Sequence, residues 1–284
     1  MDQLWPPLFH LERKGILERS IHGAVVAAHG SEIILQTFDP ILFGRSLTKP
    51  FQMKAVAKIL ADVLPWEEKA IGVSSHSGTA SQQAAVRKIL SAKDLSLIQL
   101  PSLAHPCSGK HAAILKACEL QGWPLQSYKE LSHPYNVIYR ELLEKNLGRE
   151  LATVTVAKDG CGLPTWAMRI SDLAKLFANL VVQKNDDWIW EAAQRFPEMI
   201  GGPGRVDTLI IQSSEHLFAK EGADGLLGIS VEDSRFPNGL GLIVKIAHGY
   251  DPIAAWHVAH FFLQKMQIRL PEPSPYEGQE LIWN

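Results

Sequence analysis

Two β-rich runs around a short turn make up residues 23–38, GAVVAAHGSEIILQTF. Valine, isoleucine and alanine fill the runs, and His-Gly-Ser at 29–31 has turn chemistry, so we predict a β-hairpin. Further along the chain, GLLGISVED (225–233) and GLGLIVKIAHG (239–249) have a similar composition and predict a second hairpin. Antiparallel strands are therefore expected on both sides of the middle of the chain.

The segments between the hairpins have the apolar spacing of helices. Ser46 is a suitable N-cap for a helix over 46–64, and Gly148 is a stop signal for one over 133–148. The other helical segments are 81–92, 108–120, 170–183 and 252–266. The tail after Leu270 has three prolines and is expected to be a surface coil.

Hairpins with helices between them predict an α+β fold, in which helices cover a mainly antiparallel sheet. We find no linker-like segment and no internal repeat. We therefore expect a single domain over residues 1–284.

The composition excludes several classes of function. The chain has 284 residues, 46% of them hydrophobic, and a formal net charge of -2. This balance gives no electrostatic basis for binding nucleic acid or an anionic membrane. No stretch approaches the roughly 18 apolar residues of a membrane helix, and residues 1–15 do not resemble a signal peptide. The three cysteines are widely spaced and form no disulfide framework. We expect a cytoplasmic protein with a small-molecule partner.

RSLTK (45–49) contains a serine and a lysine three positions apart. On a helix, Ser46 and Lys49 would share one face, where an unprotonated lysine can take the serine proton. Penicillin-recognising acyl enzymes use this arrangement. The same spacing also arises often by chance, so alone it leaves a purely structural role open.

Two more segments carry candidate catalytic groups. SSHSG (74–78) offers the Ser75 and Ser77 hydroxyls as second nucleophiles or proton relays, with a polar turn or helix cap as the alternative. KEGADG begins with Lys220, which resembles the lysine–x–glycine element on the far wall of serine acyl-enzyme clefts.

CSGKH (107–111) and DGCG (159–162) each place a cysteine on a glycine-containing turn. Cys107 and Lys110 have the spacing of two ligands on one helical turn. Cys161 could join them around a soft metal, with zinc as the default. The amine of a lysine ligand would have to be neutral. Buried cysteines without a metal are the alternative.

GGPGRVDT (201–208) places a guanidinium and a carboxylate beside flexible backbone. This pair suits a zwitterion, because Arg205 could bind its carboxylate and Asp207 its ammonium group. An ion pair on the surface is the alternative.

Seven segments, in this order along the chain, resemble the bacterial asparaginase II family, the Rhizobium-type L-asparaginases: RSLTKPFQ, SHSG, CSGKHAAIL, HPYN, DGCGLPT, GGPGRVDT and KEGADG. GILERSIHGAVV (15–26) is also similar to that family's opening. The resemblance implies hydrolysis of L-asparagine to L-aspartate and ammonia. It also implies a homodimer, and a fold similar to serine β-lactamases and serine glutaminases.

The resemblance also implies roles for individual residues. Ser46 and Lys49 would form a serine–lysine pair, and a serine of SHSG would add a second hydroxyl, with Ser77 slightly favoured over Ser75. Lys220 would be the cleft lysine. The positions that match the family's zinc ligands are Cys107, Lys110 and Cys161. The residues expected near the substrate are Arg45, His111, Asp159, Arg205 and Asp207.

Three residues depart from the family's pattern: Thr79, Pro106 and Lys158 stand where glutamate, asparagine and an apolar residue are usual. They leave two alternatives open. One is a glutaminase or another serine acyl hydrolase of related fold. The other is a zinc-stabilised protein that binds an amino acid without turnover, although intact Ser46 and Lys49 favour an enzyme.

Overall fold

The structure, a computed structural model, describes residues 4–91 and 95–283. Its larger sheet has seven strands, and all of their pairings are antiparallel. The strands are β1 (Pro7–Arg13), β2 (Ile16–His29), β3 (Glu32–Gln36), β7 (Leu217–Gly222), β8 (Leu226–Val231), β9 (Leu240–Ile246) and β10 (Glu280–Trp283). The order across the sheet is β10-β1-β2-β9-β8-β7, and β3 pairs with β2 off this path.

The remaining elements surround this sheet. A three-stranded sheet contains β4 (Ile41–Phe43), β6 (Pro164–Arg169) and β5 (Val156–Lys158), in that order. The helices are α1 (Lys49–Lys54), α2 (Ala57–Leu60), α3 (Trp66–Val73), α4 (Ala80–Ile89), α6 (Ser108–Gln121), α7 (Pro134–Leu147), α8 (Ile170–Val182), α9 (Ile189–Arg195), α10 (Pro197–Ile200), α11 (Val206–Ser213) and α12 (Pro252–Lys265). Two 3-10 turns are η1 (Arg45–Thr48) and η2 (Ser96–Ile98).

Both predicted hairpins form, and they meet in the larger sheet. β2 pairs with β3, and β8 pairs with β9, with Leu227 opposite Val244. The two hairpins join because β2 also pairs with β9, where Val25 lies opposite Val244. Every residue of β7, β8 and β9 is buried, so this half of the sheet is covered on both faces.

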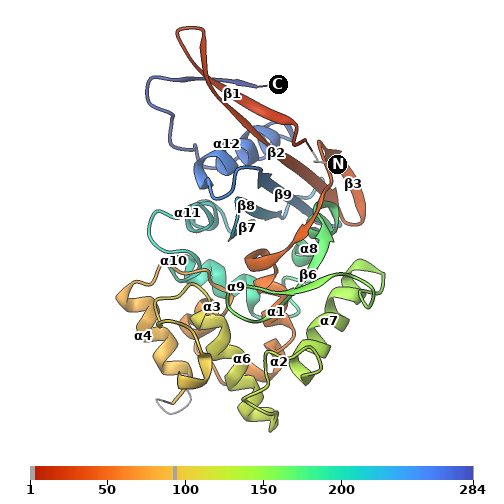
Figure 1. Cartoon of the computed structure of the whole chain (residues 1–284), viewed down its shortest axis with the longest axis vertical. Helices are drawn as coiled ribbons and strands as arrows, with labels where there is room; N and C mark the ends of the chain where they lie inside the picture. The colour runs from red at the N-terminus through yellow and green to blue at the C-terminus, as the bar shows by residue number, and fades with distance from the viewer. Residues whose placement is uncertain (1–3, 92–94, 284) are drawn as a thin grey trace.

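Helix α8 packs against β2, β8 and β9, while α12 packs against β8 and β9. The approach of α8 is so close that a Cβ at Gly241 would lie 2.1 Å from the Ala174 carbonyl oxygen. Other helices, including α3, α4 and α6, gather at the end of the molecule away from β1 and β10 (Figure 1). The predicted α+β fold is confirmed. The likeness to β-lactamases and the single domain stay predictions.

Some local predictions differ from the structure. The helix predicted over 46–64 is divided into η1, α1 and α2. Pro50 explains the start of α1 at Lys49, because a residue without an N–H is tolerated only in the first helical turn. The helix predicted over 81–92 begins earlier, at Ala80, and ends at Ile89; position 92 lies outside the described residues. The tail is not all coil, because β10 pairs with β1.

Among residues 4–91 and 95–283, no helix is both long and apolar enough to cross a membrane.

Candidate active site

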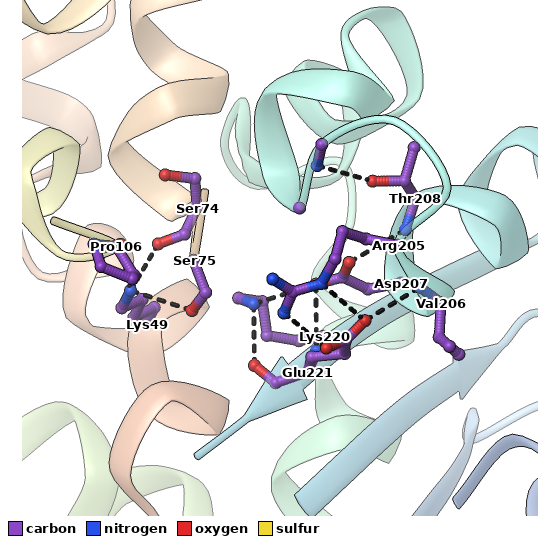
Figure 2. A network of polar contacts seen from close by, with 12 residues as sticks. Lys49, Ser74, Ser75, Pro106, Arg205, Val206, Asp207, Thr208, Lys220 and Glu221 are labelled. Carbon is purple, nitrogen blue, oxygen red and sulfur yellow. Dashed lines mark hydrogen bonds and ion pairs between the residues drawn. The ribbon is translucent and has the colours of Figure 1, made fainter. Parts of the chain in front are cut away.

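A cavity of about 370 Å³ lies between the helical region and the edge strand β7. Figure 2 shows the polar groups that face one another across it. The residues that line the cavity include Ser46, Ser75, Pro106, Arg205, Glu221, Asp224 and Tyr250. Two serine hydroxyls and a guanidinium line this cavity, so we take it as the candidate active site.

Lys49 supplies a buried amine on the helical side of the cavity. It is 1% exposed, and its Nζ lies 2.5 Å from the Ser74 carbonyl oxygen, 2.9 Å from Ser75 Oγ and 2.9 Å from the Pro106 carbonyl oxygen. Burial lowers the pKa of Lys49 to about 8. The Cys107 sulfur opposes this shift and the positive charge of Lys110 adds to it.

The three partners of Lys49 decide what its neutral form can do. A neutral amine keeps two N–H bonds and one lone pair. The Ser74 and Pro106 carbonyls can only accept, so they take the two N–H bonds. The Ser75 hydroxyl can donate, so it is the partner that meets the lone pair. Neutral Lys49 is therefore arranged to take the Ser75 proton.

The other two candidate serines lie differently. Ser46, in η1, lines the same cavity but is not one of the three hydrogen-bond partners of Lys49. Ser77 is exposed and packs against Gly202, where an added Cβ would lie 2.2 Å from Ser77 Oγ. Its Oγ lies 3.4 Å from Gln82 Oε1. The structure thus brings Ser75, rather than the favoured Ser77, to the amine.

A buried ion pair lies next to Glu221 on the opposite side, and neither of its residues is among those that line the cavity. Lys220 and Asp207 are fully buried, with 3.0 Å between Lys220 Nζ and Asp207 Oδ2. Asp207 also accepts from the backbone N–H groups of Thr208 and Glu221. These partners turn the carboxylate into the protein interior. Asp207 is therefore not free for the ammonium group of a ligand, contrary to the sequence-based expectation.

Glu221 was not singled out from the sequence, yet its carboxylate binds several of the polar groups on this side of the cavity. Its Oε1 accepts from Arg205 Nε at 3.2 Å and from the Val206 N–H at 2.8 Å. Its Oε2 accepts from Arg205 Nη2 at 2.5 Å and from the Tyr250 hydroxyl at 3.1 Å. This two-point ion pair fixes the guanidinium plane and leaves Arg205 Nη1 for a ligand in the cavity.

Cys107, Lys110 and Cys161 meet in a buried cluster near Lys49. Lys110 Nζ lies 3.3 Å from Cys161 Sγ, and the two cysteines share a hydrogen bond. The bond from Cys161 lowers the pKa of Cys107 and raises that of Cys161, so a negative charge is favoured on the Cys107 sulfur. Burial opposes a charge on Lys110, but the two cysteines raise its pKa.

Two thiols and an amine are donors that can hold a zinc ion, and the Lys110–Cys161 separation of 3.3 Å is compatible with one. Neighbouring ligands around a tetrahedral zinc with bonds of 2.0–2.3 Å lie about 3.5 Å apart, close to the Lys110–Cys161 separation. Thiolate sulfurs are among the ligands that zinc prefers. No group of three His, Cys, Asp or Glu side chains suited to a metal occurs in the described part of the chain, so the ligand set depends on a neutral Lys110.

His111 is buried one helical turn after Cys107. Its Nδ1 lies 2.6 Å from the Tyr128 hydroxyl, which is itself 3.2 Å from the Ile98 carbonyl oxygen. Because Tyr128 donates to that carbonyl, the His111 proton lies on Nδ1. Its Nε2 is then an acceptor without a partner among the described residues. His111 does not line the 370 Å³ cavity.

Arg45 and Asp159 border a second, larger cavity of about 580 Å³, which shares Asp224 with the first. Their Nε and Oδ1 atoms are 3.0 Å apart. Arg45 has a φ of 46°, a strained conformation for a residue with a side chain, immediately before Ser46. We place the reaction in the smaller cavity because both hydroxyls lie there.

Two of the three departures from the family's pattern have local roles in this structure. Thr79 forms a capping box with Gln82 at the start of α4. The Pro106 carbonyl accepts from Lys49. Lys158 lines the larger cavity.

An amine and a hydroxyl held in one buried contact can act as base and nucleophile in acyl transfer. The sequence profile of the L-asparaginase II family matches residues 9–106 and 96–277. The chain therefore belongs to the L-asparaginase II family, which supports an asparaginase-type hydrolase. A comparison with curated proteins gives no match.

Proposed function

We propose that the protein hydrolyses L-asparagine to L-aspartate and ammonia. One observation carries this proposal: in a chain of the L-asparaginase II family, the buried Lys49 amine has a lowered pKa and contacts the Ser75 hydroxyl at 2.9 Å. Such an amine is poised to act as a general base near neutral pH.

The reaction proceeds by acyl transfer. Neutral Lys49 takes the Ser75 proton while Oγ attacks the side-chain amide carbon of asparagine. As the tetrahedral intermediate collapses, protonated Lys49 gives its proton to the leaving nitrogen, and ammonia departs. Water then attacks the ester on Ser75 while Lys49 takes its proton, and Lys49 returns this proton to Ser75 Oγ as L-aspartate is released.

The other cavity residues bind and orient the substrate. Arg205, held by Glu221, offers Nη1 to the α-carboxylate. The Ser46 hydroxyl supplies a hydrogen bond to the reacting amide. Lys220 forms an ion pair with Asp207, and its positive charge is one of the contributions that lower the pKa of Lys49.

Zinc would be held by Cys107, Lys110 and Cys161. When bound, it would supply positive charge next to the substrate pocket. His111 would support this region through its unprotonated Nε2. From the family resemblance we also propose a homodimer, and from the three widely spaced cysteines a cytoplasmic location.

Ammonia release from L-asparagine and L-glutamine tests the proposal, with Ser75→Ala and Ser77→Ala as matched variants. Ser75→Ala should lower kcat by about 10⁴-fold or more, because the nucleophile is lost. Ser77→Ala should keep turnover. Preference for glutamine would favour the glutaminase alternative, and binding without turnover would favour the amino-acid-binding alternative. Activity in Ser75→Ala would transfer the nucleophile role to Ser46.

A further inference from the structure

His76 lies between the two candidate serines, and the mechanism above does not use it. Its side chain is fully buried. Both ring nitrogens have partners: Nε2 lies 2.8 Å from Ser108 Oγ, and Nδ1 lies 3.2 Å from the Gly78 backbone nitrogen. A buried histidine with both nitrogens occupied either only fills the core or holds its neighbours in place.

The hydrogen bonds of His76 allow a single tautomer. The Gly78 N–H can only donate, so Nδ1 must accept and carries no proton. The proton is therefore on Nε2, which donates to Ser108 Oγ. That oxygen can accept because its own hydrogen goes to the Leu103 carbonyl oxygen, 2.8 Å away.

His76 also stays uncharged. Burial lowers the pKa of His76 to about 4, and the Lys49 charge adds to the shift. Protonation of the ring would also place a hydrogen on Nδ1, which would then face the backbone N–H of Gly78, so that two donors would meet. The imidazole is thus a fixed link between two loops rather than a carrier of protons.

Both of the loops that His76 joins contact the Lys49 amine. On one side, Ser74 and Ser75 directly precede His76 and supply two partners of Lys49 Nζ. On the other side, Ser108 comes two residues after Pro106, whose carbonyl is the third partner. The polar surroundings of the amine are therefore built from the two segments that the His76–Ser108 contact ties together.

Close packing shows that these loops have little room to adjust. A Cβ on Gly78 would lie 2.8 Å from the Ala104 carbonyl oxygen, so the segments touch through backbone. The opposite side of the serine loop is held by the bonds from Ser75 N to Ile200 O and from Ser77 N to Gly201 O, both 2.8 Å. His76 supplies the side-chain hydrogen bond that spans to the start of α6.

We propose that neutral His76 is a positioning residue: its bonds to Ser108 and Gly78 hold Ser75 Oγ and the Pro106 carbonyl in place around the Lys49 amine. This inference rests on the proposed roles of Ser75 and Lys49. It predicts that the link to Ser108, more than the volume of the ring, determines the rate of the chemical step.

Two substitutions separate the two bonds. In His76→Gln, the amide nitrogen can replace Nε2 and keep the bond to Ser108. In His76→Asn, the amide oxygen can replace Nδ1 and keep only the bond from Gly78. We expect His76→Asn to lower kcat for asparagine by about 10²-fold with KM nearly unchanged, because small misplacements of reacting groups have effects of this size. His76→Gln should keep most of the wild-type kcat.

Ser108→Ala provides an independent test of the same link. It should reproduce the kcat loss of His76→Asn, and the double variant should lose no more than either single one, because both remove one contact. Urea unfolding of each variant checks that it is folded. Equal losses in His76→Asn and His76→Gln, or losses that multiply in the double variant, would overturn the proposal and leave His76 a core residue.

Nitrogen-15 NMR of the ring provides a readout that does not need activity. The wild-type protein should show an unprotonated Nδ1 and a protonated Nε2 for His76. A ring protonated on Nδ1 would overturn the inference whatever the rates are. If wild-type protein releases no ammonia, the proposed hydrolysis fails instead, and the ring tautomer still decides whether the link exists.

Discussion

Replacement of Lys49 by methionine should abolish turnover and also change how the stability of the protein depends on pH. Methionine is similar in length and carries no charge, so Lys49→Met removes the amine and keeps most of the side-chain volume. The amine of the native protein is almost fully buried and has a pKa of about 8, against an ordinary value of 10.5. This difference links protonation to folding.

The pKa shift from 10.5 to about 8 corresponds to about 3 kcal/mol. Below pH 8 the amine is charged in both states, so burial of the charge lowers the stability of the native wild-type protein. Between pH 8 and 10.5 the unfolded chain binds more protons than the native protein, so wild-type stability rises with pH. Above 10.5 the amine is neutral in both states, and the penalty is gone.

Methionine has no such dependence. The free energy of unfolding of Lys49→Met, minus that of the wild type, should therefore fall by about 3 kcal/mol between pH 7 and pH 10.5. Urea unfolding of both proteins across this range measures the difference, in which the other titrating groups cancel. A difference that does not vary with pH would refute the lowered pKa. Ammonia release by Lys49→Met would refute the role of the amine as base.

Two further substitutions test other parts of the site. Cys161→Ser should lower bound zinc below one ion per chain by atomic spectroscopy; an unchanged content would remove Cys161 from the ligand set. Asp207→Asn should lower the free energy of unfolding by about 3–5 kcal/mol, because Lys220 would keep a buried charge without its counter-ion. Glu191→Gln, which removes the half-exposed pair with Arg195, is its control in denaturant unfolding, and an equal loss in both would contradict the argument.

The sequence predicts the elements that depend on local pattern. The strands around 225–231 and 240–246 are apolar runs bounded by glycine or polar residues, and they form β8 and β9. β10 escapes prediction because its residues depend on a distant partner, with Phe9 opposite Trp283. The division of residues 46–64 into η1, α1 and α2 escapes prediction because the helical periodicity of the sequence continues through all three.

The candidate site shows the same division. Motifs identified Cys107, Lys110 and Cys161, and the structure brings them together. The choice between Ser75 and Ser77 could not be made, since it depends on contacts of the loop with distant segments. Glu221 was missed for a related reason.

The partners of Glu221, Arg205 and Tyr250, lie 16 and 29 positions away from it in the sequence. No short motif contains all three. The burial of Asp207 could not be predicted from the sequence either, because only the folded chain brings Lys220 next to the Asp207 carboxylate.

The way the candidate active-site cavity is built has a consequence for the stability of the folded protein. The residues that line the cavity come from two distant parts of the chain, Ser46, Ser75 and Pro106 from one and Arg205, Glu221 and Tyr250 from the other. The cavity forms only when these distant parts pack against each other, so local unfolding of either part would remove the binding site. A molecule bound in the cavity therefore stabilises the folded protein. At a ligand concentration 100 times its Kd, binding would add about 2.7 kcal/mol to the free energy of unfolding. Abundance of the substrate would then protect the protein from proteolysis, and its depletion would expose it.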